Sequence, residues 1–274
     1  MVARSRAAVL VPLYKETMTR AEEFSFRRTL AILGEHDIYL VGPERLGGYF
    51  TALKDDLGAG FGVRVFGDGY FSGVPGYNRL LKSKAFYKSF DTYEYILVVQ
   101  TDALVLSDQL SEWCDRGLSY VGAPWFDGFD APRNPLSFAG VGNGGFSLRK
   151  VHDFVRVLSY PRHIPNTLTP PTPSRSAGHR FLQWVKHRWL LAYSFAPLQP
   201  RVNEDVFWGV LVPRCCDFFS VPAPLEAVPF AFEVAPEYLY ELNDRGMPFG
   251  CHAWERYNPQ FWREVLPQHG INLP

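Results

Sequence analysis

Apolar residues follow two different patterns along the first hundred residues of the chain. Short, nearly continuous apolar runs are typical of strands that are buried on both faces. Longer segments between these runs place apolar side chains at helical spacing. The runs are AAVLVPLY, HDIYLVGP, FGVRVFG and YEYILVVQTDALVL, and the helical segments cover 19–33, 49–57 and 76–90. Alternating strands and helices predict an α/β fold, with a mostly parallel sheet and helices on both faces.

The first apolar run must be compared with a secretion signal, because two arginines precede it. The run contains Pro12, spans only about eight residues and is followed directly by charge, so a core strand is the better interpretation. No window approaches the roughly 18 apolar residues that a membrane span needs. We therefore expect a soluble or peripheral protein.

The pattern changes after residue 106, where aromatic residues, proline and glycine become frequent. The segment SYVGAPW predicts a short strand, and a polar loop leads from it to VGNGGFSLRK at 141–150. Glycines in this second segment permit a close approach of the backbone to a ligand, which a Cβ atom would block. A tight turn at a sheet edge is the alternative interpretation.

Two further segments lie between residues 161 and 195. The five prolines of 161–178 predict a loop. The segment 179–195 has the spacing of a basic, tryptophan-bearing amphipathic helix. Such a helix either packs on the core or lies on a membrane surface, where it would receive a lipid-linked substrate.

Composition and missing motifs exclude several classes of function. Lys and Arg total 28 and Asp and Glu total 28, so the chain has no general attraction for nucleic acid. No GxGxxG follows the first strand, and neither GxxxxGK[ST] nor GxSxG occurs, which removes three common α/β chemistries. The four cysteines show no CxxC spacing, and this fits a reducing compartment such as the cytoplasm.

Three polar signals interrupt the apolar pattern. The fourth predicted strand stops on Gln100, Thr101 and Asp102, and a buried Asp is costly unless something pairs with it. Strand ends in open α/β sheets are also where ligands bind. In NEDVFWG, Glu204 and Asp205 precede a helix-like run, and first-turn acids that favour the helix dipole are the alternative. His252 lies in MPFGCHAWERY, where a satisfied structural histidine is the alternative.

The order and spacing of these signals resemble those of a glycosyltransferase with the GT-A fold. In succession, YEYILVVQTDALVL, YVGAPW, VGNGGFSLRK, NEDVFWG and FGCHAW look like a bacterial family of GT-A transferases, the domain of unknown function 5672. The resemblance covers about residues 7–256. NEDVFWG is also similar to the EDV motif of inverting β1,3-glycosyltransferases.

The resemblance implies one GT-A-like catalytic domain over 1–274. Its Rossmann-type, nucleotide-sugar-binding half would cover about 7–106, its smaller acceptor half about 107–256, and a tail would cover 257–274. The implied reaction moves a sugar from a nucleotide-sugar donor to a hydroxyl of a glycan or lipid-linked sugar, with inversion. The expected setting is bacterial surface polysaccharide or glycoconjugate synthesis in the cytoplasm, with peripheral contact to the inner face of the membrane through 179–195.

The resemblance also assigns residues to roles. Asp205 is the expected general base, with Glu204 as the alternative. Asp102 and His252 are the expected ligands of Mn²⁺ or Mg²⁺. The expected donor-binding residues are Pro12, Tyr14, Asn78, Arg79, Lys82, Gln100, Thr101 and Asp102. The expected acceptor-binding residues are Trp125, Asn143, Gly144, Gly145 and Trp208.

The chain departs from the GT-A pattern at Gln100, which replaces the first acid of Asp-any-Asp. A neutral amide binds a hard cation more weakly, so either metal affinity is reduced or protein cations at Arg79, Lys82 and Lys84 replace the metal. Two other function classes stay open. A silent sugar-binding module would stack sugars on Trp125, Trp208 and Trp254. A glycoside hydrolase would need Asp102 and either Asp205 or Glu204 to flank one bond, about 5 to 10 Å apart.

Overall fold

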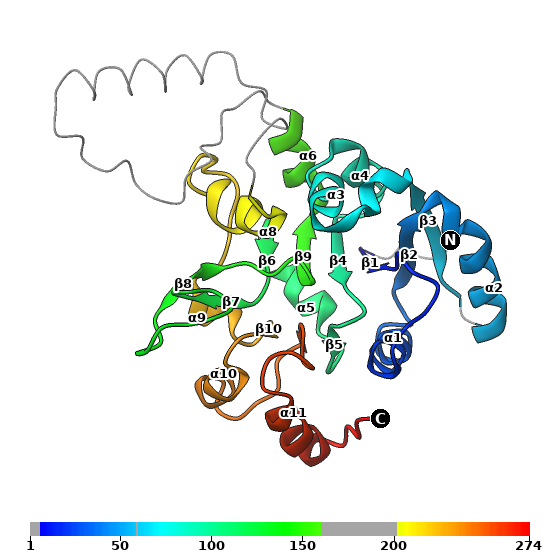
Figure 1. The fold of residues 1–274 in the computed structure, drawn as a ribbon. Coiled ribbons are helices and arrows are strands. Elements are labelled where there is room, and N and C mark those ends of the chain that lie inside the picture. Colours follow the sequence, from blue (N-terminus) through cyan, green and yellow to red (C-terminus); the bar gives the residue numbers. More distant parts are fainter. Residues whose placement is uncertain (1–5, 59, 160–201) are drawn as a thin grey trace, which may run out of the picture.

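The central sheet has the predicted, mostly parallel α/β architecture (Figure 1). The computed structural model describes residues 6–58, 60–159 and 202–274. Six strands lie in the order β3-β2-β1-β4-β9-β6, and β9 runs antiparallel to both of its neighbours. The strands are β1 (Ala7–Pro12), β2 (Asp37–Pro43), β3 (Gly62–Phe66), β4 (Tyr95–Val99), β6 (Tyr120–Val121) and β9 (Phe146–Lys150).

Both faces of this sheet are covered, as the apolar runs predict. Val9 and Val11 of β1 face a core that includes Phe26 of α1 (Arg20–Ile32). Ala8 and Leu10 face the opposite core. The helices of that second side are α3 (Gly73–Leu80), α4 (Lys84–Lys88) and α6 (Val151–Ser159), which lie together above the strands in Figure 1.

The three helices predicted in the first hundred residues are present, with one break. The helix at 19–33 begins at a capping box, in which Thr19 Oγ1 accepts from the Glu22 N–H and Glu22 accepts from the Thr19 N–H. The segment 76–90 forms two helices instead of one, because Ser83 is extended and caps Phe86. The other helices and turns of this half are η1 (Glu44–Leu46), α2 (Gly47–Leu57), η2 (Asp68–Phe71) and α5 (Leu110–Asp115).

The run YEYILVVQTDALVL forms two strands joined by a turn at Gln100–Asp102. After the turn, β5 (Leu104–Val105) pairs antiparallel with β11 (Gly250–Cys251), which runs parallel to β10 (Ala231–Phe232). This small second sheet brings the C-terminal segment to the carboxyl end of β4. His252, which follows β11 directly, therefore lies beside the turn after β4.

The remaining elements complete the second half. The strands β7 (Pro124–Phe126) and β8 (Phe138–Val141) form a separate ribbon. The helix α8 (Glu204–Val206) continues into the π-helix η4 (Phe207–Leu211). The last elements are α9 (Pro224–Ala227), α10 (Pro236–Leu242), α11 (Pro259–Val265) and η5 (Leu266–His269). The tail expected at 257–274 contains α11, whose Trp262 is buried in a third core.

The loop expected at 161–178 and the amphipathic helix expected at 179–195 lie outside the described residues. Within the described ranges, no helix combines the length and the apolar character needed to cross a membrane.

Candidate functional site

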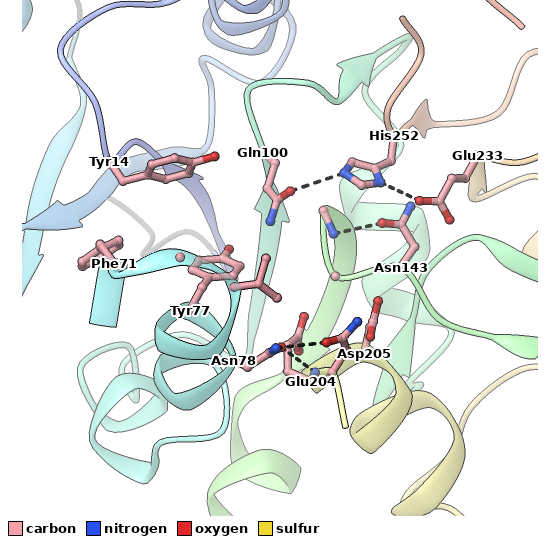
Figure 2. Close-up of a pocket in the computed structure, with 15 residues that line it drawn as sticks. Tyr14, Phe71, Tyr77, Asn78, Gln100, Asn143, Glu204, Asp205, Glu233 and His252 are labelled. Carbon is pink, nitrogen blue, oxygen red and sulfur yellow. Dashed lines mark hydrogen bonds and ion pairs between the residues drawn. The ribbon is translucent and has the colours of Figure 1, made fainter. Parts of the chain in front are cut away.

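A pocket of about 340 Å³ lies at one edge of the central sheet (Figure 2). Tyr14 follows β1, Gln100 follows β4, and the segment before β9 reaches the same edge because β9 runs antiparallel to β4. The Gln100 N–H donates to Gly145 O at 2.8 Å, which joins the two segments. The predicted site residues that line the pocket are Tyr14, Asn78, Gln100, Asn143, Gly144, Gly145, Glu204, Asp205 and His252.

The predicted acceptor-binding tryptophans do not line the pocket. Trp208 is fully buried, and its indole N–H donates to Leu81 O at 2.9 Å. Trp125 is 7% exposed and packs against Gly142, where a Cβ would collide with the indole. The prediction that Trp125 and Trp208 bind the acceptor therefore disagrees with the structure, because both rings belong to the core.

Several predicted donor-binding residues also lie outside the pocket lining. Pro12 is buried in β1, and Thr101 Oγ1 lies 3.4 Å from a Glu22 carboxylate oxygen. The Arg79 guanidinium donates to Gly69 O at 2.9 Å, and Lys82 Nζ donates to Val202 O at 2.9 Å. These two cations hold neighbouring backbone segments, and neither they nor Lys84 line the pocket.

Glu204 forms a buried ion pair with Arg149. The Arg149 guanidinium donates to both Glu204 carboxylate oxygens, at 2.9 and 3.0 Å, and also to the Tyr87 hydroxyl at 3.0 Å. Burial alone would lower the pKa of Arg149, but the Glu204 charge raises it. The Glu204 N–H donates to Asn78 Oδ1 at 2.8 Å. Glu204 is therefore held as part of the pocket wall.

Asp205 is the neighbouring acid, and its environment differs. Its Oδ1 accepts from the Val206 N–H at 2.8 Å, and the side chain lines the pocket. Among the described residues, no cation forms an ion pair with Asp205. Burial, and next the charge of Glu204, raise the pKa of Asp205 to about 6. A carboxylate with such a pKa accepts a proton readily near neutral pH.

His252 lies between oxygen atoms on both sides of its ring. Nδ1 lies 2.7 Å from Glu233 Oε1, while Nε2 lies 3.3 Å from Asp102 Oδ1 and 3.3 Å from Gln100 Oε1. Burial alone would lower the pKa of His252, but the hydrogen bonds with Asp102 and Glu233 raise it to about 10. Asp102, a predicted donor-binding and metal residue, is about half exposed and does not itself line the pocket; it contacts the pocket residue His252.

The glycine segment packs against the site's own side chains. A Cβ at Gly144 would collide with Glu204 Oε1, and a Cβ at Gly145 would collide with the His252 ring. The expected close approach is present, but its partners are protein groups, which corrects the expected reason for the glycines. Asn143 has φ 73, and its Oδ1 accepts from the Gly145 N–H at 2.9 Å. Its buried Nδ2 has no hydrogen-bond partner among the described residues.

The side chains around His252 Nε2 are of the types that bind a divalent cation. A carboxylate, an amide oxygen and an imidazole nitrogen converge there, and Mn²⁺ accepts all three. No group of three His, Cys, Asp or Glu side chains suited to a metal occurs among the described residues, so a cation held here would need the amide of Gln100 as its third ligand. The set fits a weakly held cation, which requires Nε2 to release its proton.

The pocket also contains residues that the sequence did not indicate. They are Phe71, Gly73, Val74, Tyr77, Asn203 and Glu233. Figure 2 shows Tyr14, Phe71 and Tyr77 together on one side and His252, Glu233 and Asn143 on the other. Asn203 belongs to the motif NED, whereas Glu233 follows a two-residue strand that has no recognisable pattern.

Comparisons with known proteins give one family and several distant structures. The family described as "Protein of unknown function (DUF5672)" matches residues 60–252. No curated protein matches the chain.

Among solved structures, the chain is similar to the apo-form glycosyltransferase GlyE of Streptococcus pneumoniae TIGR4, at 12% identity and a TM-score of 0.47. That match covers 95% of this chain but only 60% of GlyE. The chain is also similar to mouse xyloside xylosyltransferase 1 in its apo form, at 13% identity and a TM-score of 0.47, over 89% of this chain and 96% of that one. The Mn/GDP form of core-mannan synthase A from Aspergillus fumigatus matches at 11% identity and a TM-score of 0.41, over 74% and 72%.

Proposed function

The chain belongs to the DUF5672 family, and we propose that it is an inverting glycosyltransferase. It would move a sugar from a nucleotide-sugar donor to a hydroxyl of a glycan or lipid-linked sugar, in surface polysaccharide or glycoconjugate synthesis. The observation that carries this proposal is Asp205, an acid with a pKa of about 6 in the pocket wall, next to an acid that Arg149 neutralises. This arrangement supplies one carboxylate for proton transfer.

The donor would occupy the side of the pocket formed by residues 7–106. The rings of Tyr14 and Phe71 offer faces for a planar base, and ligands of open α/β sheets bind at the carboxyl ends of strands. A bound Mn²⁺ or Mg²⁺, held by Asp102, Gln100 and His252, would neutralise the charge that develops on the departing diphosphate.

The acceptor would enter from the side formed by residues 107–256. Asp205 would take the proton of the acceptor hydroxyl while that oxygen forms a bond to the anomeric carbon and the bond to the diphosphate breaks. Asn143 Nδ2, which has no hydrogen-bond partner among the described residues, would donate a hydrogen bond to a sugar oxygen, because a buried N–H without a partner is costly.

The same contacts count against the binding module and against one form of the hydrolase. A hydrolase that used Asp102 and Glu204 would need Glu204 free, but Arg149 binds both of its oxygens. A hydrolase that used Asp102 and Asp205 is addressed by the test for free sugar below. A module that stacks sugars on Trp125, Trp208 and Trp254 would need exposed rings, and all three are buried.

The proposal is tested in two steps. A thermal-shift screen of nucleotide sugars, with and without Mn²⁺, identifies a donor because a ligand that binds only the folded state raises the melting temperature. With that donor, Asp205→Asn should keep donor binding and lose turnover by about 10² to 10⁴-fold.

Glu204→Gln is the comparison variant in this test. Loss of turnover in Glu204→Gln with near-normal turnover in Asp205→Asn would reverse the assignment of the base. Release of free sugar from a glycan in the absence of any nucleotide would favour a hydrolase instead.

A further inference from the structure

The strand pair β10 and β11 places Glu233 beside His252. Ala231 pairs with Gly250 and Phe232 with Cys251, so Glu233 and His252 are the next residues along two parallel strands. The His252 N–H donates to Phe232 O at 3.0 Å, which continues this register. Both side chains are mostly buried, at 12% and 16% exposure, and both line the pocket.

We propose that Glu233 is a positioning residue that fixes the His252 ring, so that Nε2 serves the ligand side of the pocket. The carboxylate lies 2.7 Å from Nδ1, while Nε2 faces Gln100 Oε1 and Asp102 Oδ1. A flip of the ring would break the Glu233 contact and turn carbon atoms toward these oxygens.

The opposite edge of the ring is also confined. The ring packs so closely on Gly145 that a Cβ there would collide with Nε2. Glu233 therefore holds one edge by a hydrogen bond while the Gly145 backbone limits the other. A rigid ring of this kind costs little reorganisation when a ligand binds to Nε2.

The consequence for a cation follows from the same geometry. A carboxylate that accepts a hydrogen bond from Nδ1–H fixes the ring orientation and makes Nε2 a stronger metal ligand. Loss of such a partner weakens metal binding by about 10 to 100-fold. This inference rests on the proposed function only for the cation site at Asp102, Gln100 and His252. Binding of Mn²⁺ alone to the full chain tests it without any donor or acceptor.

The first measurement is the ring signature of His252. Spectra of ¹⁵N-histidine-labelled protein would show a hydrogen-bonded Nδ1–H in the wild type, assigned by its absence in His252→Asn. Glu233→Gln should shift or broaden this signal, whereas Glu241→Gln, an exposed acid paired with Arg245, should leave it unchanged. An unchanged His252 signal in Glu233→Gln would overturn the proposal.

The second measurement is Mn²⁺ affinity by electron paramagnetic resonance. Glu233→Gln should bind Mn²⁺ at least about tenfold more weakly than the wild type. Glu241→Gln should match the wild type. Glu233→Asp, which keeps a shortened carboxylate, should show a smaller loss, and it replaces Glu233→Gln if that variant does not fold.

The outcomes separate this proposal from the proposed function. Equal Mn²⁺ affinity in the wild type and Glu233→Gln, or no Mn²⁺ binding by the wild type, would overturn the role of Glu233. A wild type that shows the expected ring signature and Mn²⁺ binding but transfers no sugar would support Glu233 and reject the transferase.

Discussion

Two residues that line the pocket each form an ion pair with a residue behind them: Glu204 with Arg149, called the inner wall, and His252 with Asp102, called the outer wall. In the inner wall, Arg149 and Glu204 have side chains that are 0% and 4% exposed. In the outer wall, His252 and Asp102 have side chains that are 16% and 48% exposed. A fully buried pair must be satisfied entirely by protein, whereas a pair with one half-exposed partner can exchange its contacts with water or a ligand. The inner wall therefore builds the pocket, and the outer wall is available for binding.

Glu204 and Asp205 show that adjacent residues can differ in whether a buried ion pair holds them. They are adjacent in the chain, but only Glu204 reaches the Arg149 guanidinium. Asp205 lies next to it without an ion-pair partner among the described residues, and its raised pKa follows from burial and from the Glu204 charge. The two acids therefore differ in whether they reach one buried arginine and not in residue type: Glu204 is held in an ion pair, and Asp205 is not.

The largest expected effect breaks the inner wall. Arg149→Met leaves the Glu204 charge buried without its cation and removes the donor to the Tyr87 hydroxyl. Loss of one partner of a buried pair costs about 3 to 5 kcal/mol, so the free energy of unfolding should fall by that amount. Urea denaturation followed by circular dichroism measures it.

The double variant Arg149→Met with Glu204→Gln is the control for this prediction. It removes the stranded charge and should recover a large part of the lost stability. If the free energy of unfolding of Arg149→Met stays within about 1 kcal/mol of the wild type, the buried pair contributes no more than a surface ion pair, and the prediction fails.

The sequence predicted the sheet well because of how the sheet is buried. β1 and β4 are covered on both faces, so their residues form continuous apolar runs that strands of a parallel sheet require. The break of 76–90 into two helices was not predicted, since the cap at Ser83 interrupts an otherwise regular helical spacing. The pairing of β10 with β11 was also not predicted, because a strand of two residues is too short to show an alternation of apolar and polar residues.

The site was predicted only where its chemistry lies in short motifs. QTD, NED and CHAW contain Gln100, Asp205 and His252, which the structure brings to one pocket. Arg149 gave no such signal, because an arginine near the end of a predicted strand resembles a surface residue. Trp208 was misread, since an aromatic residue beside an acid has the same sequence pattern in a core and in a sugar site.

A smaller effect sharpens the contrast between the two neighbouring acids. A base with a pKa of about 6 must be deprotonated to act, so turnover should be level above pH 6 and fall about tenfold per pH unit below it. A rate profile measured with saturating substrates tests this expectation. Turnover that is independent of pH between about 5 and 8 would remove Asp205 from the proton transfer.

Stability should move in the opposite direction for the same residue. A carboxyl whose folded pKa is raised binds more protons in the native state, so its contribution to stability falls as the pH rises from about 4 to 6. Asp205→Asn removes this penalty and should unfold at a higher urea concentration than the wild type above pH 6. If Asp205→Asn is inactive and also more stable than the wild type, Asp205 lowers stability and is needed for turnover.

The smallest expected effect concerns the outer wall. Asp102→Asn removes the partner of His252 Nε2, but the lost carboxylate is about half exposed and Glu233 still holds Nδ1. An ion pair this open to water contributes at most about 1 kcal/mol, so the free energy of unfolding should fall by no more than that at pH 7.

The pH dependence of this effect follows from the two pKa values. The pKa of Asp102 is lowered although burial opposes this, since His252 donates to it. The contribution of Asp102 to stability is therefore lost as the pH falls below its folded pKa. The pKa of His252 is raised to about 10, so its contribution is fully present below its unfolded pKa of roughly 6.5 and is lost as the pH rises through 10. The stability difference between the wild type and Asp102→Asn should therefore be visible by urea denaturation at pH 7 and should shrink as the pH rises through about 10, where His252 loses its charge. A loss as large as that of Arg149→Met would show that the two walls do not differ in kind, and the outer pair would then be as structural as the inner one.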